Sequence, residues 1–503
     1  MHRRLHRLGV AAALTTLALV LSACGGPGTG TTPDPSTPPS EASSLTVGLV
    51  LPPTNLDIRH TDGAALEQVL IDNVYEGLVT RGGTEIVPRL ASEWDISADG
   101  LEYTFTLQSG VTFHNGEAMT SADVVASMEA VRTDESLQGH GDLAGVASIT
   151  APDAQTVVIT LTEPNLDFLF LLTGRAGLVL QDGDTTDLKT AENGTGPFSL
   201  TRWAQGSTLT FGRYDGYWGE PAGLSEVVFS YIDDGTARIN AALDGSLDVL
   251  TEVDPTLLPQ LEATGDFTFT YGRTTNTATL AFNNARAPLN DVRVREALRL
   301  AIDHDALVEA LGGGDTLYGP IPELDPGYED LSALAPYDPA RAMELLAEAG
   351  QENLELTLTI PNFYSTTIAR VLVSDFAKVG VTLDVNVVEF ATWLEDVYTN
   401  KDYELSFVYH AESRDFGNYA NPDYYFGYDN AQVQALYAES LRQTDPDAAA
   451  KLLAEAARIV SADHAADWLF NAVTITALRP GVSGFPEDLV SLRLDMSRVT
   501  ATE

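Results

Sequence analysis

The segment LELTLTIPNFYSTTIARVLVSDFAKVGVTLDVNV, residues 354–387, changes its hydrophobic period twice. Every second residue is apolar over 354–360, and the same alternation returns over 381–387, as in strands with one buried face. Between them a helix is predicted at about 368–379. A strand, a helix and a second strand in succession predict an α/β domain.

The regions on either side of this segment continue the alternation. Asp338-Pro339 is typical of a helix start, and Gly350 of the position where that helix ends. Residues 403–409 are predicted to form a strand, and residues 431–442 and 447–463 are predicted to form helices. The C-terminal half of the chain is therefore expected to be a mixed α/β structure.

The N-terminal half has a different pattern. Apolar residues occupy every second position of residues 101–107, which predicts a half-buried strand. Thr120, with Asp123 three residues later, has the spacing of a helix cap. The apolar residues that follow fall on one helical stripe: Val124, Val125, Met128 and Val131. This part is predicted to combine antiparallel strands with a helix.

Composition excludes several classes of protein. The 503-residue chain has a formal net charge of -44, which repels nucleic acid and anionic lipid headgroups. Its single cysteine allows no intramolecular disulfide, and its hydrophobic content of 44% is ample for a large core. No Gly-x-Ser-x-Gly or His-Glu-x-x-His motif occurs, so no hydrolase site is predicted. The eight histidines have no metal-ligand spacing, and neither a metal nor a cofactor is expected.

The first residues are typical of an export signal. Three arginines precede an uncharged run at residues 8–23, which is too short for a membrane span. Residues 1–23 are therefore predicted to be a signal peptide. The sequence Leu21-Ser22-Ala23-Cys24 resembles the lipobox of bacterial lipoproteins, which implies that Cys24 is acylated and becomes a lipid anchor. The protein is then expected on the extracytoplasmic face of the cell membrane.

Residues 24–44 are predicted to be a disordered tether. Nearly all of them are Gly, Pro, Ser or Thr, a composition that cannot bury enough apolar surface to offset the entropy of ordering. A flexible coil of this length reaches about 25 Å. The folded part is expected to move above the membrane while remaining attached.

Four blocks of motifs follow one another along the chain. The first is VPRLASEW at residues 87–94 with GVTFHNG at 110–116, and the second is GTGPF at 194–198 with Tyr217-Trp218. The third is DVRVR at residues 291–295 with AID at 301–303, and the fourth is YDPA at 337–340. In this order they resemble the extracellular solute-binding proteins of ABC importers, in particular the large peptide-binding family often called family 5.

Most motif residues also have a structural interpretation. Gly194 and Gly196 suit a tight chain reversal, and without a following Lys-Ser/Thr they do not form a phosphate loop. His114, as a lone histidine, is predicted to be structural. Arg293 and Arg295 follow Asp291 at a helix start, where surface or interdomain salt bridges are expected.

The resemblance implies an α/β fold of three lobes, a type II clamshell of the periplasmic-binding-protein kind. Lobe I is expected to combine residues 45–75, 191–275 and 476–503. Lobe II, residues 76–190, is the extra lobe that distinguishes this family from smaller binding proteins. Lobe III, residues 276–475, is expected to close onto lobe I.

The resemblance also implies a mechanism. Two chain crossings, near Thr275 and Thr476, are expected to serve as a two-strand hinge. Closure around it shifts an existing equilibrium between open and closed forms. The implied function is the capture of a small solute, most simply a short peptide, and its delivery to the permease subunits by a monomeric lipoprotein.

The segment HAESRDFG, residues 410–417, is the expected ligand site. It follows a predicted strand, so its polar residues emerge at a strand end. In peptide-binding relatives an aspartate in this region pairs with the α-ammonium group of the peptide, and Asp415 is the best match, with Glu412 second. A buried ammonium needs such a carboxylate. Arg414 is a further candidate; alternatively, it neutralises Asp415 within a purely structural ion cluster.

Aromatic residues complete the candidate site. Trp393 occupies a position that often reaches the cleft in relatives, with core packing as the alternative. Tyr424 follows the acidic segment and is a second candidate, whereas Tyr425 and Phe426 are predicted to belong to the core. Flat rings accommodate varied side chains or sugars.

Other cargoes are compatible with the same resemblance. Metal chelates, haem, glutathione and oligosaccharides remain alternatives to a peptide. A receptor whose bound peptide acts as a signal, without import, would have the same kind of site.

Overall fold

The computed structural model of the chain describes residues 43–61, 63–362, 364 and 366–502. The predicted signal peptide, Cys24 and nearly all of the predicted tether lie outside the described residues. Ser44 was predicted to be the last residue of the disordered tether, but it is the first residue of strand β1 (Ser44–Leu49), where it pairs with Glu226. Within the described ranges, no helix has both the length and the apolar character needed to cross a membrane.

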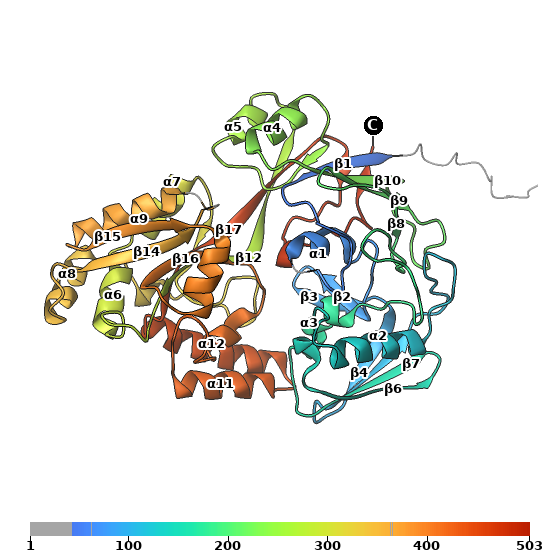
Figure 1. Ribbon diagram of the computed structural model, residues 1–503, viewed down its shortest axis with the longest axis horizontal. Helices are drawn as coiled ribbons and strands as arrows, with labels where there is room; N and C mark the ends of the chain where they lie inside the picture. The colour runs from blue at the N-terminus through green and yellow to red at the C-terminus, as the bar shows by residue number, and fades with distance from the viewer. Residues whose placement is uncertain (1–42, 62, 363, 365, 503) are drawn as a thin grey trace, which may run out of the picture. The chain divides into compact units, whose positions relative to one another are not determined.

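Two long antiparallel strands lie at the middle of the main sheet (Figure 1): β12 (Thr268–Phe282) and β17 (Ala466–Leu478). Residues 277–282 of β12 also pair with β16 (Leu405–His410). At the opposite end of the strand pair, β17 pairs with β11 (Val249–Leu250). Two groups of strands are therefore attached to opposite ends of one strand pair. The expected crossing residues, Thr275 and Thr476, lie in these two strands.

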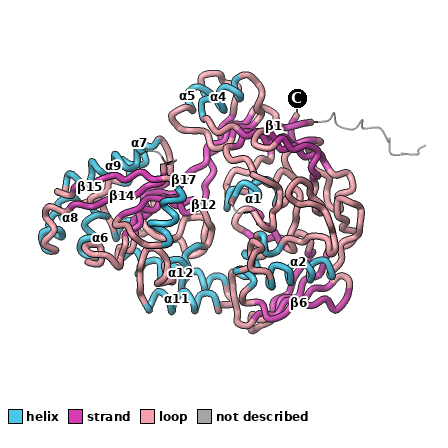
Figure 2. Tube along the Cα trace, in the orientation of Figure 1, coloured by secondary structure: helices cyan, strands magenta, loops and turns pink. Residues whose placement is uncertain are grey.

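The group of strands next to β16 is the predicted α/β unit. Strand β14 (Glu355–Pro361) pairs in parallel with β15 (Thr382–Val388), and helix α9 (Thr366–Lys378) connects them. This confirms the predicted order of strand, helix and strand. The buried face predicted for the second strand is only partly observed, because Val385 and Val387 of β15 are exposed. Helices surround these strands (Figure 2). They include α6 (Val292–Leu300), α7 (His304–Leu311), α8 (Pro339–Glu348), α11 (Ala431–Leu441) and α12 (Pro446–Ala462).

The group next to β11 is built from early and middle parts of the chain. Strand β1 pairs in parallel with β10 (Glu226–Tyr231), which is followed in the sheet by β9 (Thr208–Arg213) and β8 (Phe198–Ala204). The short helices of this part are α1 (Ala64–Leu70), α4 (Gly235–Leu243) and α5 (Leu258–Glu262).

A separate four-stranded antiparallel sheet follows the order β4 (Ala91–Ile96), β5 (Glu102–Leu107), β7 (Thr156–Leu161) and β6 (Val146–Asp153). Helix α2 (Ser121–Thr133) contacts it and begins with the predicted capping box of Thr120 and Asp123. Nearby lie a hairpin, β2 (Val79–Gly82) and β3 (Glu85–Pro88), and helix α3 (Phe168–Leu171). The predicted combination of antiparallel strands with a helix is confirmed.

Three large hydrophobic clusters are built from different sets of residues. One has members between residues 278 and 470, around the α/β unit. A second lies between residues 78 and 179, under the antiparallel sheet. A third combines residues 45–75 with later residues, up to 499. Each group of elements therefore packs around its own core.

The first two motif blocks converge on one buried carboxylate, Glu76, which has no exposed surface. It accepts hydrogen bonds from Thr195 Oγ1 at 2.8 Å and from Tyr217 OH at 2.9 Å. Trp218 Nε1 also donates to it at 3.1 Å, and Arg89 Nε forms an ion pair with it at 2.7 Å. Residues from the first and second motif blocks are thus parts of one structural network.

His114 is structural, as predicted. Its Nδ1 lies 2.6 Å from Glu192 Oε2, and its Nε2 lies 2.9 Å from the carbonyl oxygen of Gly196. Burial alone would lower the pKa of His114, but Glu192 and this carbonyl outweigh it and raise the pKa. Gly194 and Gly196 lie so close to the main chain of residues 73–74 that a Cβ at either position would clash with it.

The two arginines of the third block differ from each other. Arg293 forms the predicted surface salt bridge, with Asp291 Oδ2 at 2.6 Å. The salt bridge predicted for Arg295 is wrong. The buried Arg295 guanidinium instead donates to three main-chain carbonyl oxygens, those of Leu289, Asp463 and His464. These carbonyls satisfy its donors without a carboxylate.

Candidate ligand-binding site

The candidate segment begins where β16 ends, at His410, as the sequence predicted. Ser413 and Arg414 form a turn in which Arg414 has the left-handed backbone angle φ of 60°. Asp325 holds this turn, because its carboxylate accepts from Ser413 Oγ at 2.5 Å and from the Arg414 main-chain N–H at 2.6 Å. Asp415 follows at the start of a short 3₁₀ helix.

A cavity of about 310 Å³ brings together four of the five predicted ligand-site residues. Asp415, Glu412, Trp393 and Tyr424 line it, and Arg414 does not. The remaining lining residues are Tyr364, Phe390, Leu394, Tyr398, Val408, Tyr409, His410, Ala411 and Tyr425. We call this space the aromatic cavity. Its lining contains two carboxylates and no arginine or lysine.

Asp415 is the carboxylate with fixed partners. Its Oδ2 lies 3.3 Å from His410 Nδ1 and 3.3 Å from Asn418 Nδ2. His410 Nε2 in turn lies 3.0 Å from the hydroxyl of Tyr425. These contacts orient the Asp415 side chain and leave it room to accept further hydrogen bonds from a ligand.

Glu412 is exposed at the cavity, and its carboxylate has no hydrogen-bond or ion-pair partner within the part of the chain that the structure describes. Desolvation, and then the charge of Asp415, raises its pKa. Asp142, far away in the sequence, belongs to the same electrostatic environment. Burial raises the pKa of Asp142 to about 6, with further contributions from the charges of Glu67 and Glu412. Negative charge is therefore in excess on this side of the site.

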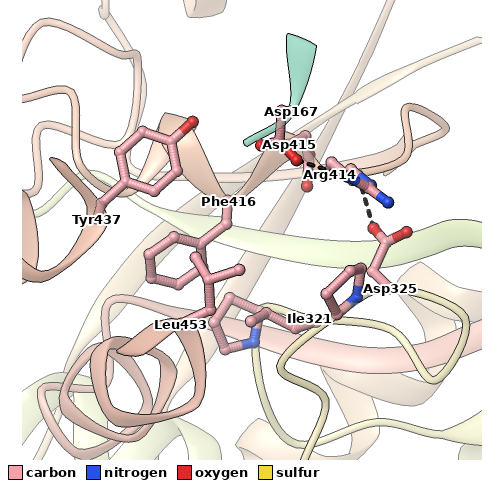
Figure 3. A pocket seen from close by; sticks show the side chains of 10 residues that line it. Asp167, Ile321, Asp325, Arg414, Asp415, Phe416, Tyr437 and Leu453 are labelled. Atoms are coloured by element: carbon pink, nitrogen blue, oxygen red, sulfur yellow. Dashed lines mark hydrogen bonds and ion pairs between the residues drawn. The ribbon is translucent and has the colours of Figure 1, made fainter. Parts of the chain in front are cut away.

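Arg414 does not neutralise Asp415. Its Nη1 forms an ion pair with Asp167 Oδ1 at 2.6 Å, and its guanidinium lies 4.4 Å from the ring centre of Phe170. The guanidinium of Arg81 lies 4.2 Å from the centre of the same ring. Arg414 and Asp167 border a small cavity of about 20 Å³ (Figure 3). The proposed ion cluster of Glu412, Arg414 and Asp415 is thus replaced by a contact between distant segments.

The segment around Asp167 makes further contacts with the C-terminal half. The main-chain N–H of Leu166 donates to the carbonyl of Leu441 at 2.8 Å. The Nη2 atom of Arg442 lies 3.9 Å from Oε2 of Glu163, an ion pair between the same two parts of the chain. These contacts, with that of Arg414, attach residues 163–170 to the C-terminal half of the chain at two places, the turn at Arg414 and the end of α11.

The aromatic residues divide between cavity and core. Trp393 is 5% exposed and donates through Nε1 to Ser406 Oγ at 2.8 Å, so it is a core residue whose surface also lines the cavity. Tyr424 is half-buried and lines the cavity as well. Tyr425 and Phe426 are buried, which confirms their predicted core packing.

Sequence reasoning missed the other walls of the cavity. Phe390, Leu394 and Tyr398 follow one another at intervals of four residues, and this spacing could have indicated a helical apolar stripe. Tyr364 carries no such signal, because only the fold brings it to the site.

The turn that presents Asp415 is expected to respond to pH. Burial raises the pKa of Asp325 to about 6, above its ordinary value of 3.8. The folded state therefore holds this proton more tightly, and the resulting stabilisation is present below about pH 4 and is lost as the pH rises through about 6. On acidification from about pH 7 to pH 5, the melting temperature of the wild type should rise relative to that of Asp325→Asn. Thermal unfolding measured at both pH values tests this. Equal changes in the melting temperatures of the wild type and of Asp325→Asn would contradict the raised pKa of Asp325.

No cluster of three or more histidine, cysteine or acidic side chains that could hold a metal ion occurs among the residues with described positions. The candidate site is therefore described by its cavity, its two carboxylates and its aromatic walls.

Comparisons with known proteins agree with this architecture. The model of the bacterial extracellular solute-binding proteins, family 5 Middle, matches residues 85–431. Heme-binding protein A of Haemophilus influenzae is 28% identical over 465 residues, covering 82% of this chain and 84% of that protein. The dipeptide-binding protein of Escherichia coli is 28% identical over 381 residues, which cover 69% of this chain and 70% of that protein. These relatives are solute-binding proteins rather than enzymes, as predicted.

Solved structures share the fold. The periplasmic binding protein DppA of Helicobacter pylori, in complex with the peptide STSA, has a TM-score of 0.79 at 23% identity and covers 92% of this chain and 98% of its own. The substrate-binding protein CtaP of Listeria monocytogenes has a TM-score of 0.84 at 20% identity, and the match covers 92% of this chain and 100% of that protein's chain. The predicted fold class is therefore confirmed.

Proposed function

The chain belongs to the bacterial extracellular solute-binding proteins of family 5, and from this premise we propose that it captures short peptides beside Asp415 and delivers them to an ABC permease. The observation that carries the proposal is the aromatic cavity, whose lining has two carboxylates and no basic side chain other than His410. The α-ammonium of a peptide needs a paired carboxylate to leave water, and Asp415 supplies one in a fixed orientation.

Haem is the second candidate, because a haem-binding protein is among the relatives. Haem carries carboxylates, which Asp415 and Glu412 would repel at this position. At about 310 Å³ the aromatic cavity is also at the small end of ligand pockets. These two features favour a peptide over haem.

A thermal-shift screen tests the choice. Peptides of two to five residues should raise the melting temperature by several degrees, as expected for a ligand that binds only the folded state. Haem, metal chelates and oligosaccharides serve as alternatives in the same screen. A shift with one of these, and none with any peptide, would contradict the peptide proposal.

We also propose that the chain is divided into three lobes at the boundaries predicted from the sequence. The separate hydrophobic clusters support the division, and the long pair β12 and β17 is the element about which the lobes would move. The contact of Arg414 with Asp167 would then belong to the closed form. Closure would exclude water from the ion pair of Arg414 and Asp167 and so strengthen the attraction between their charges.

Attachment to the membrane is the remaining part of the proposal. With Cys24 acylated, the protein would act as a monomer near its permease on the extracytoplasmic face. Cys24→Ala should release the protein from the membrane fraction without changing its affinity for peptide. Fractionation followed by immunoblotting measures this, and retention of the variant in the membrane fraction would contradict the lipid anchor.

Uptake and signalling differ in the fate of the captured peptide. Deleting the gene should reduce the uptake of labelled peptide if the protein serves import. Unchanged uptake would support a receptor whose bound peptide is a signal.

A further inference from the structure

An apolar stripe is exposed within the aromatic cavity. Phe390, Leu394 and Tyr398 are 42%, 40% and 44% exposed, although each is a large apolar or aromatic residue. They lie on helix α10 (Phe390–Trp393) and on the π-helical turn that continues it, Leu394–Thr399. All three line the cavity. Apolar groups that gather around a hollow, instead of being scattered singly, indicate a binding surface.

The rings around this stripe form a wall in which Trp393 contacts both Phe390 and Tyr398. Phe390 stacks on Trp393 with ring centres 5.8 Å apart and planes 6° apart. Tyr398 meets the edge of Tyr424 at 5.8 Å, and Tyr364 contacts Tyr409 at 5.3 Å. Trp393 is in addition fixed by its hydrogen bond to Ser406. Trp393, which is buried, therefore holds Phe390 and Tyr398 in place in this wall.

The apolar wall and the carboxylates lie in the same cavity. In a peptide, the α-ammonium and the side chain of the first residue are bonded to the same carbon atom. A site that pairs the ammonium with Asp415 must therefore place the first side chain in the immediate surroundings of Asp415. Those surroundings are the rings and aliphatic groups of the aromatic cavity.

We propose that the aromatic cavity selects peptides whose first residue has a large apolar or aromatic side chain, with Phe390, Leu394 and Tyr398 as its specificity-determining residues. This inference rests on the proposed function, because it takes the bound ammonium as its starting point. A first residue with an anionic side chain would meet the charges of Asp415 and Glu412. A first residue with a small side chain would leave the apolar wall in contact with water.

The test uses isothermal titration calorimetry of the wild-type protein with Ala-Ala and with dipeptides that each differ from Ala-Ala in one position. The panel is Phe-Ala, Leu-Ala, Ala-Ala, Ala-Phe, Lys-Ala and Glu-Ala. Phe-Ala and Leu-Ala should bind at least about tenfold more tightly than Ala-Ala, because burying the extra apolar carbons favours binding. Ala-Phe should bind more weakly than Phe-Ala, which separates a preference for the first residue from general hydrophobicity.

Two variants locate the preference. Phe390→Ala combined with Leu394→Ala should reduce the ratio of Phe-Ala to Ala-Ala affinity to about threefold or less. Tyr337→Ala is the matched control, because Tyr337 is also exposed, at 43%, but does not line the cavity. Its affinity ratio should equal that of the wild type. Circular dichroism checks that all variants are folded.

The outcomes are distinguishable. Equal affinities across the panel, a preference for Lys-Ala or Glu-Ala, or an unchanged ratio in the double variant would each overturn the inference while leaving peptide binding intact. Failure of every peptide in the panel to bind would overturn the proposed function itself, and this inference with it.

Discussion

Glu76→Ala is expected to destabilise the folded protein by about 3–5 kcal/mol, the range found when one partner of a buried ion pair is removed. Glu76 has no exposed surface. It forms an ion pair with Arg89 and accepts hydrogen bonds from Thr195 and from both aromatic residues of the Tyr217-Trp218 motif. Without the carboxylate, the Arg89 charge and three polar donors remain buried with a partner missing. Burial raises the pKa of Glu76, whereas Arg89 and the three donors act against this shift.

Differential scanning calorimetry measures this effect as a lower melting temperature, by about 5 °C. Glu85→Ala is the matched control, because Glu85 is an exposed carboxylate in the neighbouring hairpin and should leave the melting temperature unchanged. An unchanged melting temperature in Glu76→Ala would show that the motif network does not stabilise the fold.

Asp415→Ala is expected to weaken peptide binding by about 30-fold or more, because the loss of one partner from a buried charge pair costs about 2–5 kcal/mol. The variant leaves the ligand ammonium without its oriented carboxylate. His410 and Asn418, which contact Asp415 Oδ2, would also lose an acceptor. Titration calorimetry with a peptide that binds the wild type measures the change.

The controls separate Asp415 from its acidic neighbours. Asp423→Ala removes an exposed carboxylate outside the cavity and should not change the affinity. Glu412→Gln should have a smaller effect than Asp415→Ala, because Glu412 has no partner that orients it in the described structure. If Glu412→Gln abolished binding while Asp415→Ala did not, the two carboxylates would exchange their proposed roles.

Local patterns could be predicted from the sequence because they depend on neighbouring residues. The two changes of period in residues 354–387 correspond to β14, α9 and β15. The spacing of Thr120 and Asp123 corresponds to the capping box of α2. In each case the hydrogen bonds or the buried face arise within a few residues, so the sequence carries the whole signal.

Contacts between distant segments could not be predicted in the same way. The ion-pair partner of Arg414 is Asp167, 247 residues away, and the adjacent Asp415 is not used. The convergence of the first two motif blocks on Glu76 likewise depends on the fold, and Glu76 itself lies outside those motifs. Trp393 was predicted to belong either to the cleft or to the core. It belongs to both, because it is buried and its surface also lines the cavity.

The candidate site likewise has features that could be predicted from local sequence and features that only the fold shows. The segment 410–417 could be placed at a strand end, because a strand was predicted at residues 403–409, which β16 confirms. The stripe of Phe390, Leu394 and Tyr398 has a helical spacing, but only the folded chain shows that its exposed face lines the same cavity as Asp415.

Acetylation of the peptide amino terminus tests the central claim most directly, because it removes the positive charge of the ammonium group that Asp415 is proposed to bind. Titration calorimetry would compare one peptide that binds the wild type with the same peptide in its N-acetylated form. Pairing of the ammonium with Asp415 predicts that the acetylated form binds at least about 30-fold more weakly. Equal affinity of the two forms would contradict the account, because the ligand would then be held without its ammonium.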